Sequence, residues 1–263
     1  MWLDSTSFGS IVEVAVNLQL RALHFFVCPF VGGRCIRPLV QLLVQDAELR
    51  ELSFYNEGNS ILESDELDGD VERAVHDALL DALASSSLRV VSLKQCGIEY
   101  FGANIIQIFV GHPFLEELSL MSDFRDDNGG PNAEGEEFSF ATALGELVAF
   151  DSPALRSLRL AGQLRERALP LFDALPHNTH LQHLELNGSC MNAEFLREVV
   201  FPRVRENTSL LVLNIHFDGP DFDNDADDAD YQLAWPIMDE LRDFVRDRAA
   251  AAAAVGRAPG EAE

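Results

Sequence analysis

The sequence predicts an α/β solenoid, a horseshoe of about seven repeats with a parallel sheet inside and helices outside. Two observations predict it. A short apolar pattern recurs seven times along the 263-residue chain, and the segments between the copies have helical apolar spacing. A single strand–helix unit cannot bury its apolar face alone, so stacked units would share one continuous core.

Each copy has three apolar positions, with two residues between the first and second and one residue between the second and third. The clearest copy is Leu88, Val91 and Leu93, followed by Cys96 and Ile98. The second and third apolar residues lie two apart, so they share one face of a strand. The copies begin at Leu20, Leu49, Leu88, Leu115, Leu155, Leu181 and Leu210, at intervals of 29, 39, 27, 40, 26 and 29 residues.

This pattern resembles the leucine-rich repeat, L-x-x-L-x-L-x-x-N/C-x-L, over roughly residues 10 to 245. The 26–29 residue intervals are similar to the ribonuclease-inhibitor-like type. The resemblance implies that a full helix follows each strand and that strand residues pointing away from the helices form a concave binding face.

The segments between the copies predict the outer helices. Val71, Ala74, Val75, Ala78 and Leu79 follow helical spacing, and Asp70 is a suitable N-cap. Similar spacing predicts helices at about 36–46, 101–110, 139–150, 166–175 and 193–205, and a half-repeat helix at 8–16.

The end of the chain divides into a capping helix and a tail. Trp235, Ile237, Met238, Leu241 and Val245 predict an amphipathic helix that closes the last repeat, with Pro236 in its first turn. We therefore expect one repeat domain over residues 1–248 and a disordered, Ala-rich tail over 249–263.

The charge excludes several classes of partner. There are 19 Lys and Arg residues against 44 Asp and Glu, a net charge of −25. Binding to nucleic-acid phosphates or to anionic membranes needs clustered basic residues, so neither is expected. Three acidic runs, at 57–72, 123–137 and 218–230, contribute −19 of the net charge and follow the second, fourth and seventh copies.

These acidic runs are expected to be loops that project from one edge of the sheet. They are open to three interpretations: solvated loops, a docking edge for a protein with a basic patch, or a weak divalent-cation site. The docking candidates are Asp221, Asp223, Asp225, Asp227 and Asp228. An EF-hand loop would need Gly where Ala226 stands and Glu where Gln232 stands, so no metal site is assigned.

The concave face also carries candidates for partner binding. One position of the repeat is rich in arginine in an otherwise acidic chain, and a second position is polar throughout. These side chains either solubilise the face or form a mixed polar recognition surface. The candidates for recognition are Arg21, Arg50, Arg89, Arg156, Arg159, Glu185 and His183.

The sequence has no motif for catalysis, for a metal or for a cofactor. Phosphate-binding, zinc-protease, C-x-x-C and G-x-S-x-G patterns are absent. His177, His180 and His183 are close in sequence, but a turn and an outward strand position would keep them apart. We therefore expect neither enzymatic activity nor a bound cofactor.

The resemblance implies a non-enzymatic scaffold that binds a protein partner. Proteins of this architecture also include GTPase-activating proteins of the Ran-activator type and substrate receptors of ubiquitin ligases, and both stay open as alternatives. We expect a monomer. The start of the sequence lacks the basic region of a signal peptide, so a cytoplasmic or nuclear location is expected.

Overall fold

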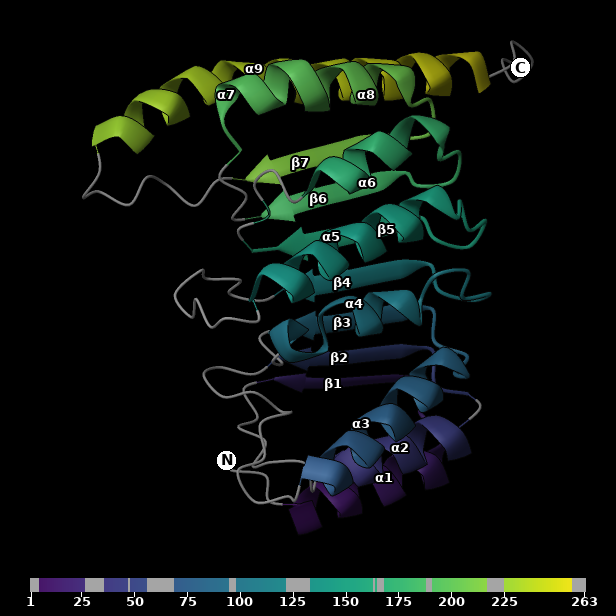
Figure 1. The fold of residues 1–263 in the computed structure, drawn as a ribbon. Coiled ribbons are helices and arrows are strands. Elements are labelled where there is room, and N and C mark those ends of the chain that lie inside the picture. The colour runs from purple at the N-terminus through teal and green to yellow at the C-terminus, as the bar shows by residue number, and fades with distance from the viewer. Residues whose placement is uncertain are drawn as a thin grey trace, which may run out of the picture.

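The computed structural model describes residues 5–26, 36–46, 48–55, 69–94, 98–121, 133–162, 164, 168–187, 191–216 and 225–256. Seven strands form one open parallel sheet in the order of the chain (Figure 1). They are β1 (Ala22–Phe26), β2 (Glu51–Tyr55), β3 (Val90–Lys94), β4 (Glu117–Met121), β5 (Ser157–Ala161), β6 (His183–Asn187) and β7 (Val212–His216).

The seven strands confirm the seven copies of the apolar pattern. The second and third apolar positions pair in register from strand to strand, as in Leu118 opposite Leu158 and Leu120 opposite Leu160. These positions are buried in all seven strands and form the centre of the core. Leu118 and Leu158 are fully inaccessible to solvent.

Helices cover one face of this sheet, most of them packed on a neighbouring helix, and the last one lies across the end of the sheet at β7 (Figure 1). They are α1 (Ser5–Leu18), α2 (Ile36–Gln45), α3 (Gly69–Ala84), α4 (Ile98–Gln107), α5 (Ala133–Ala149), α6 (Leu169–Ala174), α7 (Ala193–Phe195), α8 (Phe201–Glu206) and α9 (Asp225–Gly256). A 3₁₀ turn, η3 (Leu175–His177), follows α6, and a π-helical turn, η4 (Leu196–Val200), joins α7 to α8.

The turns from helix to strand contain a buried polar residue that the sequence argument did not identify. Asn178 Oδ1 accepts from the backbone N–H of Leu181 at 2.7 Å, and its Nδ2 donates to the Val148 carbonyl at 2.8 Å. Asn207 repeats this one unit later, donating to the Leu175 carbonyl at 2.7 Å. Each asparagine satisfies buried backbone groups of its own turn and of the preceding repeat. The signal in the sequence is a polar residue three positions before the first leucine of each copy.

The end of the chain differs from the sequence prediction. The tail expected at 249–263 is not a tail over 249–256, because α9 continues through the alanine run to Gly256. Alanine has the highest helix propensity, so the helix does not end where its apolar spacing ends. Residues 257–263 lie outside the described part.

Helix α9 also begins earlier than predicted. It starts at Asp225 and has Pro236 in its interior, whereas the sequence argument placed Pro236 in the first turn. Like α9, helices α3 and α5 begin inside an acidic run, at Gly69 and Ala133. Carboxylates stabilise the first turn of a helix through its dipole. The last residues of each acidic run therefore form the first turn of a helix rather than part of a loop.

Candidate functional site

The face of the sheet opposite the helices is a surface to which all seven strands contribute. We call it the open sheet face. It consists of three rows of residues in register across the strands. The first row is Ala22, Glu51, Val90, Glu117, Ser157, His183 and Val212. The second is His24, Ser53, Ser92, Ser119, Arg159, Glu185 and Asn214. The third is Phe26, Tyr55, Lys94, Met121, Ala161, Asn187 and His216.

Three of the predicted binding residues lie on this face. Arg159 and Glu185 are neighbours in the second row, and His183 is in the first row next to Ser157. His183 is exposed, whereas Arg159 and Glu185 are half-buried. Their common location follows from the alternation of side chains along a strand, which can be read from the spacing of residues in the sequence.

Arg159 is the centre of a charged cluster on the open sheet face. Its guanidinium lies 3.4 Å from Glu117 Oε1 and 3.8 Å from Glu185 Oε2. Asn187 Nδ2 donates to Glu185 Oε1 at 2.9 Å. The Arg159 side chain remains 43% exposed, so these contacts orient the guanidinium without removing it from solvent. A partner would meet a preordered cluster of both charge signs.

The other four predicted arginines are not on the open sheet face, and that placement is wrong. Arg21, Arg50, Arg89 and Arg156 each stand one residue before the first residue of a strand. Their backbone extends the sheet pairing: the Arg21 carbonyl accepts from Arg50 N–H at 2.8 Å and from Glu51 N–H at 3.0 Å. They have the parity of the buried strand positions but lie beyond the helix-covered core. Their side chains therefore line the edge where the strands begin, which we call the amino edge.

The amino edge is not uniformly basic. Arg89 pairs with Glu116 at 2.9 Å, and the Arg50 guanidinium donates to Ser87 Oγ. Arg21 and Arg156 are exposed. This edge carries arginine at four of the repeats, whereas the acidic runs follow the opposite ends of β2, β4 and β7.

The acidic docking candidates are only partly within the described chain. Asp221 and Asp223 lie outside the described residues. Asp225, Asp227 and Asp228 belong to the first turns of α9 rather than to a loop. Their role in binding a partner stays a prediction.

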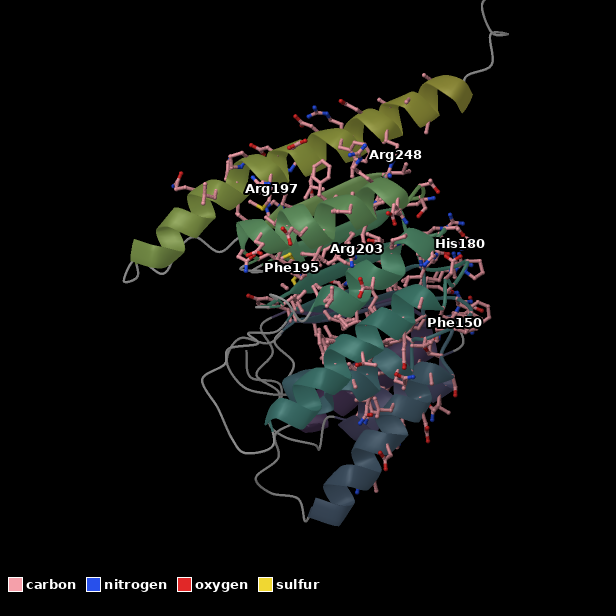
Figure 2. All side chains as sticks on the ribbon, turned by 45° about the horizontal axis from the view of Figure 1, so that its top comes forward. Phe150, His180, Phe195, Arg197, Arg203 and Arg248 are labelled. Atoms are coloured by element: carbon pink, nitrogen blue, oxygen red, sulfur yellow. The ribbon has the colours of Figure 1, made fainter. Side chains whose placement is uncertain are left out.

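A Thr–His–Asp group at the turn before β6 has the His–Asp contact of a catalytic triad but not the triad's hydrogen bond between the hydroxyl and Nε2 of the histidine. Thr179 Oγ1 donates to Asp151 Oδ2 at 2.7 Å, and His180 Nδ1 lies 2.9 Å from Asp151 Oδ1. In a triad the hydroxyl would bond to the other ring nitrogen of the histidine. Burial raises the pKa of Asp151, but the hydrogen bonds from Thr179 and His180 outweigh it and leave that pKa below its usual value. The group links two turns at the edge where Figure 2 shows His180 and Phe150.

His177, His180 and His183 do not come together. His177 is in η3, His180 is held by Asp151, and His183 is on the open sheet face. Within the described ranges, no three His, Cys, Asp or Glu side chains are grouped as metal ligands would be. None of the described helices is both long and apolar enough to span a bilayer.

The fold is a leucine-rich-repeat-like solenoid with one covered and one open sheet face. No protein-family model matches the sequence, and no curated protein matches it. Among solved structures, actin-binding site 2 of leiomodin-1 is similar at 16% identity with a TM-score of 0.36, covering 62% of this chain and 84% of that chain. A similarity of that size does not indicate a partner for this chain.

Proposed function

We propose that this chain is a non-enzymatic interaction scaffold of the ribonuclease-inhibitor-like repeat type, which binds a protein partner through the open sheet face. The observation that supports it most is the row-by-row register of that face around the Arg159 cluster. A rigid sheet presents these side chains at fixed spacing, so little conformational freedom is lost on binding. Arginine oriented by two carboxylates is also a frequent contributor to interface energy.

The net charge of the chain indicates the sign of the charge that its partner carries. With a net charge of −25, the chain attracts proteins that carry a basic patch and repels acidic ones. The acidic run at 218–230 would speed association, and the open sheet face would hold the complex. The partner's basic patch would then contact Glu117 and Glu185 as well as the run.

The experiment begins with affinity capture of a partner and then measures the purified pair. Ser92→Tyr adds a large side chain in the middle row of the open sheet face and should weaken binding by about tenfold or more, or about 1.4 kcal/mol. Gln45→Tyr places the same side chain at an exposed position of α2 and should leave the dissociation constant unchanged. Equal affinities of the parent and both variants would contradict binding through this face.

A further inference from the structure

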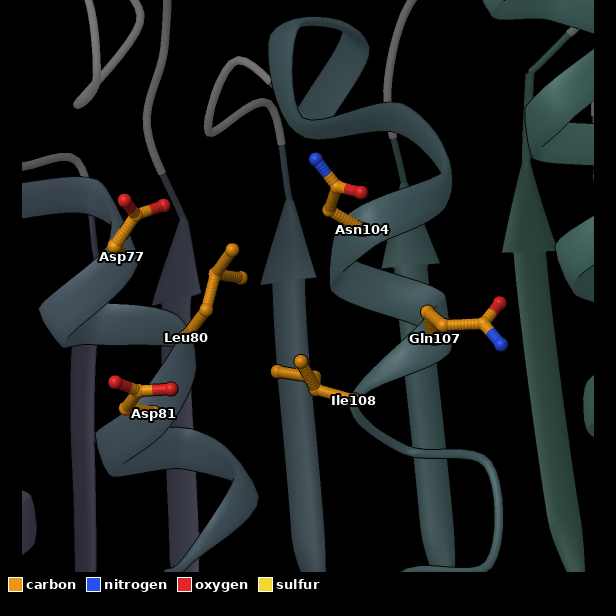
Figure 3. Close-up of a pocket in the computed structure, with 6 residues that line it drawn as sticks. All are labelled: Asp77, Leu80, Asp81, Asn104, Gln107 and Ile108. Carbon is orange, nitrogen blue, oxygen red and sulfur yellow. The ribbon is translucent and has the colours of Figure 1, made fainter. Parts of the chain in front are cut away.

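The layer of helices on the covered face has a break between α3 and α4. In the described part of the chain, α1 packs on α2, α2 on α3, α4 on α5 and α5 on α6, whereas α3 and α4 do not pack closely. An open groove of about 580 Å³ separates them (Figure 3). The helix layer is therefore two packed groups, α1–α3 and α4–α6, with a groove where they meet.

The groove has an apolar base and polar walls of two kinds. Leu80 of α3 and Ile108, just after α4, form the base and are half-buried against the core. Asp77 and Asp81 lie one turn apart on α3, and Asn104 and Gln107 stand on α4 across from them (Figure 3). A ligand in this groove would contact the two carboxylates of α3 on one side and Asn104 of α4 on the other, whereas the Gln107 carboxamide points away from α3 (Figure 3).

The two carboxylates are exposed and form no ion pair with another described residue. Among the side chains that the structure describes, no basic one lines the groove. Across it, Gln107 is engaged with α5, where its Nε2 donates to Glu146 Oε2 at 3.0 Å. A carboxylate only accepts hydrogen bonds, so a matching group must bring donors and positive charge.

We propose that the groove between α3 and α4 binds a basic amphipathic segment of a partner protein. Aliphatic side chains of the segment contact Leu80 and Ile108. Two basic residues of the segment, one helical turn apart, pair with Asp77 and Asp81. This is the helix-in-groove mode of recognition. The sign of the charge disfavours an acidic segment, and it disfavours a second copy of this chain, whose net charge is also −25.

This surface is on the helix side and is independent of the open sheet face. The test uses a fluorescein-labelled synthetic peptide of about 18 residues, or about five helical turns, with Leu on one face and Lys on the other. A peptide of the same composition, scrambled to remove the apolar face, serves as the comparison. The parent protein should bind the amphipathic peptide more tightly than the scrambled one.

Asp77→Asn combined with Asp81→Asn should weaken binding of the amphipathic peptide by about three- to thirtyfold, as expected for two exposed ion pairs. The matched control is Glu194→Gln with Glu198→Gln, because these residues are also exposed and four positions apart. It removes the same charge elsewhere in the helix layer and should change affinity less than twofold. Ser92→Tyr on the open sheet face should have no effect on this peptide.

Methyl NMR locates the bound peptide directly, since Leu80 and Ile108 signals should shift in the complex. Equal weakening by the two double variants would show general attraction to a negatively charged protein and would overturn the proposal. Unchanged binding by the Asp77 and Asp81 variant, or equal binding of the two peptides, would also overturn it. None of these outcomes bears on the open sheet face.

Discussion

The two ends of the solenoid are closed in different ways, although each end helix leaves two large apolar residues exposed. At the last repeat, α9 lies across β7 and places Ala234, Ile237, Met238, Leu241 and Val245 in the core, while Leu233 and Trp235 of the same helix are 63% and 46% exposed (Figure 1). At the first repeat, α1 buries Val12 and Ala15 but leaves Val14 and Leu18 at 55% and 64% exposure.

Polar contacts reinforce the cap at the last repeat. The guanidinium of Arg248 donates to the backbone carbonyls of Val204, Asn207 and Leu210 and lies 5.5 Å from the centre of the Phe244 ring. Figure 2 shows it on the side of α9 that faces the repeats. In the preceding repeat, the equivalent carbonyls of Leu175, Asn178 and Leu181 accept hydrogen bonds from Asn207 and Ser209 of the next repeat. Arg248 supplies these donors where the last repeat has no next repeat.

Closing an end of the solenoid therefore needs different residues from those that build its repeats. A long helix with Asp and Arg on its outer side closes one end. At the other end, β1 has β2 on one side and no further strand among the described residues. Unpaired strand edges favour association. In the described part of the chain α9 packs closely on β7, whereas no helix packs as closely on β1, so the first repeat is the more vulnerable end.

The largest effect is expected from removing the cap. Deletion of residues 225–263 should expose the apolar face of the last repeat and cause aggregation or loss of cooperative unfolding. Deletion of 257–263 alone should do neither. Thermal unfolding and light scattering check both truncations, and similar curves for the two would show that α9 is not a cap.

A pair of matched substitutions compares the two ends directly. Leu241→Asp places a carboxylate at a fully buried position of the cap and should lower the free energy of unfolding by several kcal/mol. Leu18→Asp changes an exposed position of α1 and should stay within about 0.5 kcal/mol. Urea denaturation measures both, and a large loss in the Leu18 variant would mean that α1 is covered in solution.

Removing the polar part of the cap should have a smaller effect. Arg248→Met keeps much of the apolar stem but leaves three backbone carbonyls without their donor. We expect a loss of about 1–3 kcal/mol in the free energy of unfolding. Arg248→Lys should recover part of this loss, whereas Arg246→Met, at an exposed position of the same helix, should cost little.

The turn before β4 should add a pH dependence, because a histidine stands there where the turns before β6 and β7 have asparagine. His112 occupies the position of Asn178 and Asn207, and its Nδ1 accepts from the Leu115 N–H at 3.1 Å. Burial lowers the pKa of His112 below 6.5 in the folded chain. The unfolded chain therefore binds the proton more strongly, so the free energy of unfolding should fall as the pH drops below about 6.5.

His112→Asn should reduce this fall, because asparagine makes the same turn without titrating. Urea denaturation between pH 7.5 and about pH 5 tests it, and exposed His177→Asn is the control for losing a histidine. An unchanged pH dependence in the His112 variant would contradict the assignment.

The smallest effect on stability is expected at the start of α9. Asp221, Asp223, Asp225, Asp227 and Asp228 changed to Asn should slow association with a basic partner. The free energy of unfolding should stay nearly level, because less repulsion between carboxylates offsets the lost interaction with the helix dipole. The difference from the parent should shrink with salt, as the Debye length falls from about 10 Å at 0.1 M to about 3 Å at 1 M. Stopped-flow binding checks it, and equal rates at low salt would leave the open sheet face as the whole interface.

Much of the fold was predictable because its signals are local and repeated. The spacing of Leu88, Val91 and Leu93 defines both the strand and its buried side, and seven such copies define a parallel sheet in chain order. The positions of Arg159, Glu185 and His183 on the open sheet face follow from the same parity. The four arginines of the amino edge were misplaced, because they were assigned to the open sheet face although they have the parity of the buried positions, which the same period of two already shows.

The sequence by itself determined the number of repeats, the buried positions and the sign of the charge, since each depends on residue type and spacing along the chain. Only the tertiary structure decided how far α9 extends, which carbonyls Arg248 caps and where the helix layer separates between α3 and α4. These features depend on distances between segments far apart in the sequence. No local pattern encodes such distances, because they result from packing all the repeats together.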